Sequence, residues 1–196
     1  MKKLYPALGT GLLTLAFVLA GCADASAPAE KATASSESAS ATANEADEMF
    51  VKMMIPHHQQ AVEMSEIILA KDALDPRVSE LAQQIKDAQG PEIERMLSWL
   101  ENWGVEYDPD GMEGMDHGSM DGMMSEEDLA ALKEADAQEA SRLFLDQMIV
   151  HHEGAVDMAE TALNDAQNTD VLDLAQQVID DQTAEIATMQ DLLDQL

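Results

Sequence analysis

Hydrophobic residues recur at every third or fourth position through most of the chain from residue 46 onward, which is the spacing of helices that bury one face. The same segments are rich in Ala, Leu, Glu, Gln and Met and poor in β-branched runs, which also favours helices. The predicted helices cover about residues 47–70, 76–103, 126–134, 137–163 and 170–196.

Several residues at the ends of these segments are helix-boundary signals. Asp75-Pro76 and Ser125 are typical of helix starts, and Gly104 is typical of a helix stop. Proline also occurs inside the first two predicted helices. We therefore expect a kink or a helix start at Pro56, and a kink at Pro91.

The hydrophobic pattern is duplicated. Residues 50–69 return at 144–163 with an offset of 94, and residues 78–85 return at 171–178 with an offset of 93. The repeating unit is therefore a pair of helices in a hairpin. Two such hairpins predict an all-α four-helix bundle.

The chain before the helices divides into two segments. Residues 1–21 have the features of a lipoprotein signal peptide, since a short apolar run ends in a stretch that resembles a bacterial lipobox at Cys22. That resemblance implies lipidation of Cys22, and an ordinary signal peptide cut nearby is the alternative. Residues 22–45 are mostly Ala, Ser, Thr and Glu, so we expect a disordered linker between the lipid and a bundle domain at 46–196.

The net charge narrows the range of partners. The chain has 39 acidic and 10 basic residues, a formal net charge of −29. This disfavours nucleic acid and favours cations, metal ions included, although an ordinary soluble surface is an alternative explanation. Cys22 is the only cysteine, which excludes a disulfide framework. The sequence contains no nucleophile motif or phosphate loop, so we do not expect an enzyme.

Four of the five histidines form adjacent pairs at matching places in the repeat, His57-His58 and His151-His152. On a helix, each pair shares a stripe with methionines before and after it. These methionines are Met54, Met64, Met148 and Met158. Adjacent side chains on a helix diverge by about 100°, so one histidine of each pair can bind a metal while the other contacts a neighbour. The sequence does not choose between them, nor between one shared site and two.

The combination of imidazole and thioether favours copper. Thioether sulfur is a good ligand for Cu(I) and a poor one for Fe³⁺ or Mg²⁺, and imidazole binds both copper oxidation states. A di-iron bundle would carry Glu-x-x-His, whereas both copies here carry Met-x-x-His. Zinc has little use for thioethers, and a blue-copper site needs a cysteine. Glu66 and Glu160 also recur and are candidates for supporting the ligands.

Residues 110–124, between the two halves, are rich in Gly and Asp and predict a loop. The loop carries the fifth histidine and five methionines: Met112, Met115, His117, Met120, Met123 and Met124. Exposed methionines gain little from packing. We therefore expect this loop to capture soft metal ions loosely.

The duplicated stretches Met54-Ile-Pro-His-His-Gln-Gln-Ala-Val-Glu-Met64 and Met148-Ile-Val-His-His-Glu-Gly-Ala-Val-Asp-Met158 resemble the doubled signature of the bacterial family called domain of unknown function 305. The resemblance covers about residues 48–196. It implies a ferritin-like four-helix bundle, an extracytoplasmic location and, as in some members, copper binding with a role in copper resistance. The ligands implied by position are Met54, His57, His58, Met64, Met148, His151, His152 and Met158. Val150 stands where the family usually has proline, which affects the shape of the helix more than metal binding.

We therefore expect an extracytoplasmic, lipid-anchored protein that sequesters or transfers Cu(I), with Cu(II) and silver as further ions. A copper-exporting or copper-accepting protein is an expected partner. The main alternative is an envelope-tethered helical interaction module with no metal role, in which the histidines serve packing. A redox enzyme is a third, weaker hypothesis.

Overall fold

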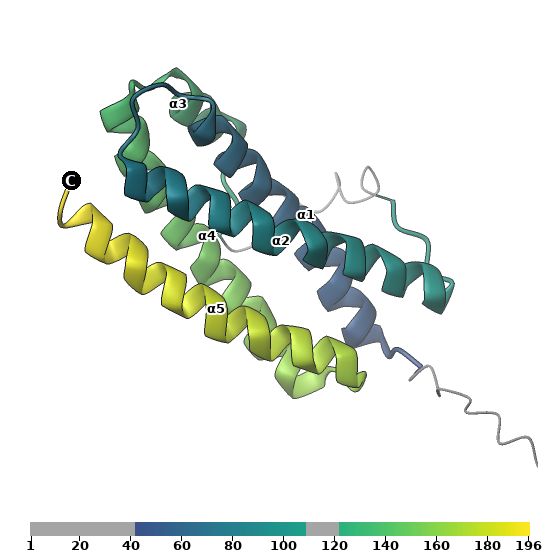
Figure 1. Cartoon of the computed structure of the whole chain (residues 1–196). Helices are drawn as coiled ribbons and strands as arrows, with labels where there is room; N and C mark the ends of the chain where they lie inside the picture. Colours follow the sequence, from purple (N-terminus) through teal and green to yellow (C-terminus); the bar gives the residue numbers. More distant parts are fainter. Residues whose placement is uncertain (1–41, 109–121) are drawn as a thin grey trace, which may run out of the picture. The chain divides into compact units, whose positions relative to one another are not determined.

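The computed structural model describes residues 42–108 and 122–196 (Figure 1). The predicted signal peptide, Cys22 and the linker up to residue 41 lie outside the described residues, as do Met112, Met115, His117 and Met120. The helices in the described part are α1 (Glu45–Leu69), α2 (Pro76–Trp103), α3 (Glu126–Glu134), α4 (Ala137–Asp165) and α5 (Thr169–Leu193).

The helix ends follow from local hydrogen bonding. Ser125 caps α3, and its backbone N–H donates to Asp128 in return, so two otherwise unpaired amides are satisfied. Asp75 caps α2, whose first residue is a proline, and Gly104 ends that helix with φ of 72°. These boundaries confirm the signals in the sequence. Pro56 is a different case: α1 begins at Glu45 and runs through it, so a helix start at Pro56 is wrong.

The long helices form two hairpins, α1 with α2 and α4 with α5, and the hairpins pack together through α1 and α4. The start of α1 lies against the end of α4, since Asn44 Nδ2 donates to the carbonyl of Asp165 at 3.0 Å. These two central helices are therefore antiparallel. The prediction of an all-α, ferritin-like four-helix bundle built from duplicated hairpins is confirmed, with the short α3 added beside α1 and α4.

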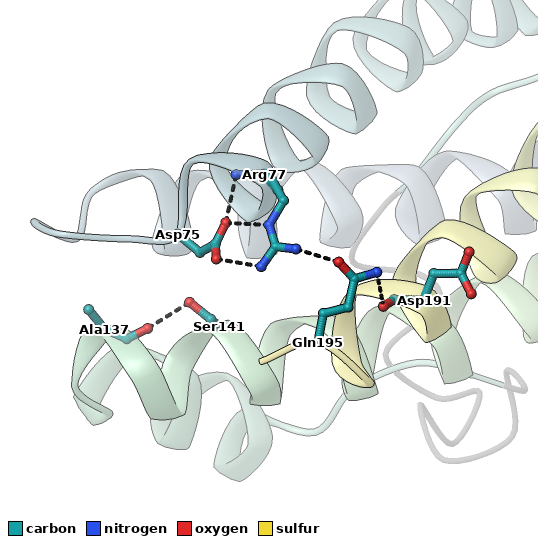
Figure 2. A network of polar contacts seen from close by, with 6 residues as sticks. All are labelled: Asp75, Arg77, Ala137, Ser141, Asp191 and Gln195. Atoms are coloured by element: carbon teal, nitrogen blue, oxygen red, sulfur yellow. Dashed lines mark hydrogen bonds and ion pairs between the residues drawn. The ribbon is translucent and has the colours of Figure 1, made fainter.

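The outer helices α2 and α5 make little direct backbone contact and are joined by polar side chains. Near the start of α2, Arg77 is held by Asp75 and donates from Nη1 to Gln195 Oε1 at 2.7 Å, just beyond α5 (Figure 2). Farther along, Gln177 on α5 donates to Glu92 on α2 at 2.8 Å.

The interior consists of two hydrophobic clusters with a polar layer between them. One cluster includes Met64 and Met148 and is covered by Leu132 of α3. The other includes Met54 and Phe50 and lies toward the opposite end of the bundle. Each long helix contributes residues to both clusters, and its polar residues lie where it passes from one to the other. The fold thus places a polar layer near the middle of an apolar interior.

Among residues 42–108 and 122–196, the helices lack the combination of length and hydrophobicity that a membrane span requires.

Candidate metal centre

The polar layer contains the four histidines of the two pairs, and all four are fully buried. The first histidine of each pair points toward the other hairpin. The rings of His57 on α1 and His151 on α4 lie 3.7 Å apart between centroids, with their planes tilted by 37°. The two histidine-bearing helices therefore face each other, and the centre of the layer is a pair of imidazoles in contact.

The second histidine of each pair points to the partner helix of its own hairpin. His58 Nε2 lies 2.8 Å from Glu92 Oε2 on α2, and His152 Nε2 lies 2.6 Å from Glu185 Oε2 on α5. The carboxylates are nearer the surface than the histidines, with side chains 12% and 22% exposed. The structure thus divides each pair into one ring at the centre and one ring held by a glutamate.

These contacts determine which ring nitrogens are available. A carboxylate oxygen accepts hydrogen bonds, so in the neutral rings of His58 and His152 the proton lies on Nε2 and Nδ1 carries the lone pair. Nδ1 of both rings is buried without a hydrogen-bond partner. A buried lone pair with no donor nearby is available to a metal ion, and a histidine held by a carboxylate through its other nitrogen is a common arrangement around metals.

His151 is also set up to remain neutral. Burial, and after it the nearby His57, His152 and His58, hold the pKa of His151 well below its usual value of 6.5, with a weak backbone contact from His57 acting in the opposite direction. Its two ring nitrogens make no well-formed hydrogen bond. A neutral imidazole needs to lose no proton before it binds a cation.

The predicted sulfur ligands lie in different surroundings. Met54 and Met148, one turn before the histidines, are fully buried at the edges of the polar layer, and Met64 is buried in the cluster under α3. Met158 is only half-buried and lines a pocket on the outside of α1 and α4. Met54, Met64 and Met148 are therefore enclosed in the bundle interior, while Met158 is partly accessible from the surface.

The described end of the methionine-rich loop is docked beside the histidine helices. Gln60 on α1 donates to the carbonyl of Met124 at 2.9 Å and accepts from its N–H at 2.7 Å. Gly122, with φ of 88°, lies so close to α4 that an added Cβ would be 2.7 Å from the carbonyl oxygen of Val150. Met123 and Met124 line a surface pocket with Pro56. The loop therefore returns to the bundle next to His57 and His151.

Sequence reasoning missed Glu92 and Glu185 as partners of the histidines. They occupy equivalent places in the repeat, with an offset of 93, and this duplication was the available signal. The acids singled out in their place do not contact the histidines: Glu66 forms an exposed ion pair with Lys86, and Glu160 is exposed. Gln89 and Gln182, one turn before the two glutamates, are also duplicated, buried and left with an unpaired Oε1.

The arrangement favours soft-metal chemistry over hard-metal chemistry. Within the described residues, no group of three or more His, Cys, Asp or Glu side chains is arranged to hold a metal ion. The carboxylates of the layer are engaged by His58 and His152. The rings at the centre are imidazoles, with the buried Met54 and Met148 one helical turn before them, and imidazole with thioether is a donor set suited to copper.

Comparisons with known proteins agree with this architecture. The family model described as domain of unknown function (DUF305) matches residues 47–193. The chain is similar to a DUF305 fragment from Deinococcus radiodurans, with 33% identity over 79% of this chain and 99% of that chain and a TM-score of 0.68. A DUF305 protein from Streptomyces coelicolor, described as secreted, is 33% identical over 76% of this chain and 93% of its own, with a TM-score of 0.70.

The copper protein CopM is also similar. In its Cu(I)-bound form it is 33% identical over 76% of this chain and 96% of that chain, with a TM-score of 0.63. Structures of CopM with Cu(II), with silver and without metal match as well. No curated protein matches the chain.

Proposed function

The chain belongs to the DUF305 family, and we propose that within this family it is an extracytoplasmic copper-binding protein that sequesters or transfers Cu(I). The observation that carries the proposal is the buried layer of four histidines, in which His57 and His151 meet and His58 and His152 are each held by a glutamate. The solved structures of CopM with Cu(I), Cu(II) and silver support this choice of metal.

The layer is difficult to explain as packing alone. Burying polar nitrogen without a hydrogen bond costs about 1–3 kcal/mol, and the ring nitrogens of His151 and Nδ1 of His58 and His152 are all in this situation. A metal ion that accepts these lone pairs would offset that cost. The proposed ligands are the four imidazoles, with Met54 and Met148 as the adjacent sulfur donors.

The route to the layer passes the glutamates. Glu92 and Glu185 stand between solvent and the histidines on the face where α2 and α5 make little backbone contact. Their negative charge, in a chain with a net charge of −29, attracts a cation toward the buried rings. The described end of the methionine-rich loop, where Gln60 of α1 holds Met124, supports a role for this loop in delivering ions.

Other parts of the proposal rest on the sequence and on the relatives. The secreted description of the Streptomyces coelicolor protein supports an extracytoplasmic location, and the lipobox-like stretch supports anchoring to a membrane through Cys22. The protein binds and passes on metal ions and does not catalyse a reaction. Its expected protein partner is one that exports or accepts copper.

The test is an anaerobic Cu(I) titration of the purified protein against a competing chelator. Changing His57 and His151 to Gln removes the central imidazoles and should abolish tight binding. Changing Met96 and Met189 to Leu is the matched control, because these buried methionines are also duplicated but belong to the outer helices α2 and α5 and are not among the proposed ligands. Copper binding equal to that of the parent in the histidine variant would refute the site. No binding by the parent would refute the function and favour a helical interaction module.

A further inference from the structure

A pocket of about 260 Å³ lies on α1 and α4, at the end of the bundle where α1 begins and α4 ends. Three methionines line it: Met49 and Met53 from α1, and Met158 from α4. Met49 is 51% exposed and the other two are half-buried. The pocket is therefore a surface feature lined by three methionines, and none of its lining residues belongs to the buried histidine layer.

The equivalent surface in the other half of the repeat is sealed by α3. With the offset of 94, Met49 and Met53 correspond to Leu143 and Gln147. Gln147 Nε2 donates to the carbonyl of Asp128 in α3 at 3.2 Å, and Leu143 packs against the cluster that α3 covers. The two halves of the repeat can therefore be compared directly. In one half this surface is covered by α3, and in the other it is an open pocket lined by methionines.

The charged residue at the edge of this surface also differs between the halves. Lys71 donates from Nζ to the carbonyls of Lys133 and Ala135, at 2.9 and 2.7 Å, and so holds the end of α3. Its counterpart beside the open pocket is Asp165, whose side chain is exposed. A positive charge suited to carbonyl oxygens in one half is replaced by a negative charge suited to a cation in the other.

We propose that Met49, Met53 and Met158 form a surface site for a soft monovalent cation, Cu(I) or Ag(I), that fills independently of the histidine layer. Thioethers bind such ions without competition from protons and bind hard cations poorly. Met49, at 51% exposed, gains little from packing, and its place beside two further methionines in one open pocket is better explained by their shared sulfur chemistry. Met53 precedes His57 by one helical turn, about 6 Å of rise, which places the surface site next to the buried one.

The test uses the full chain labelled with ¹³C at the methionine methyl groups and titrated with Ag(I), which is diamagnetic and resists further oxidation. The methyl signals of Met49, Met53 and Met158 should shift together and saturate as a single silver ion fills this site, whatever the histidine layer takes up. The double variant Met49→Leu and Met53→Leu keeps the apolar volume and should lose that ion and the shift of Met158. The control Met96→Leu and Met189→Leu should behave as the parent.

The histidine ring ¹⁵N signals, followed in the same samples, separate this inference from the function proposed above. If the histidine signals respond to silver and the three methyl signals do not, the surface site is refuted while the histidine site stands. If the methyl signals respond in the double histidine variant as in the parent, the two sites are independent as proposed. If a hydrophobic dye changes the chemical shifts of the three methyl groups and silver does not, the pocket is an apolar docking surface and the metal assignment is wrong.

Discussion

The two glutamate–histidine contacts allow a specific prediction, because each can be weakened with a change of a single atom. Glu92→Gln and Glu185→Gln keep an oxygen within reach of the ring but remove the charge. The contacts are 2.8 and 2.6 Å long and join fully buried rings to carboxylates that are 12% and 22% exposed. Hydrogen bonds to charged groups contribute about 1.5–3 kcal/mol, roughly twice the neutral value. Each substitution should therefore lower the free energy of unfolding by about 1 kcal/mol.

The same substitutions should also lower the affinity of the protein for Cu(I). Loss of a carboxylate that orients a ligand histidine typically lowers metal affinity about 10–100-fold. The glutamine amide can also donate to Nε2, which frees His58 or His152 to move its proton to Nδ1, the atom proposed to bind the metal. We expect a drop in Cu(I) affinity of about tenfold, together with a mixed tautomer signal in ¹⁵N spectra of the metal-free protein.

Chelator competition measures the affinity, denaturant titration the stability, and ¹⁵N spectroscopy the tautomer. The matched controls are Glu66→Gln and Glu160→Gln, which alter duplicated but exposed acids that make no contact with the histidines. If Glu92→Gln and Glu185→Gln bind copper as the parent does and retain the Nε2–H tautomer, the orienting role is wrong. Equal losses in the control variants would show that only the overall negative charge matters.

Three further predictions concern the scaffold. Asp47→Ala removes the buried carboxylate that accepts three backbone N–H groups, two of them from the loop before α5, and should cost on the order of 2–4 kcal/mol in denaturant titrations. Arg77 holds the pKa of Asp75 at about 2, so Arg77→Gln should move the carboxyl midpoint in ¹³C spectra toward 3.8; the stabilisation from this pair is present above pH about 4 and is lost as pH falls toward 2. Gly122→Ala places a Cβ 2.7 Å from the carbonyl oxygen of Val150; the loop end should detach from α4 at a cost of about 1–3 kcal/mol, seen as faster amide exchange at residues 122–124.

The helices were predictable because their signals are local. Capping residues such as Ser125 and Gly104 act within one turn, and the apolar spacing reports the buried face directly. Pro56 shows the limit of local reasoning: a proline favours a break, but α1 continues through it because the flanking turns are fixed by burial of Ile55 and His57.

The partners of the histidines were not predictable in the same way. The sequence predicted that each pair shares a helix stripe with methionines, and the structure adds that all four histidines are buried. Whether His57 meets His151, or His58 meets Glu92, depends on how helices far apart in the sequence are rotated and aligned along their axes. Spacing within one helix carries no information on that alignment. The identity of the ligands therefore stays a prediction for the titrations described above.

The duplication itself explains why the histidines are at the centre. When two copies of a helix pack antiparallel, only residues at the symmetry axis meet their own counterparts, and His57 and His151 are such a pair. Away from the axis, each residue faces a different one, as Met54 packs in the cluster that contains Ala155. A metal held by the axial pair would be shared equally by both halves. Positions off the axis are free to diverge, which is how Met53 can line an open pocket while its counterpart Gln147 binds α3.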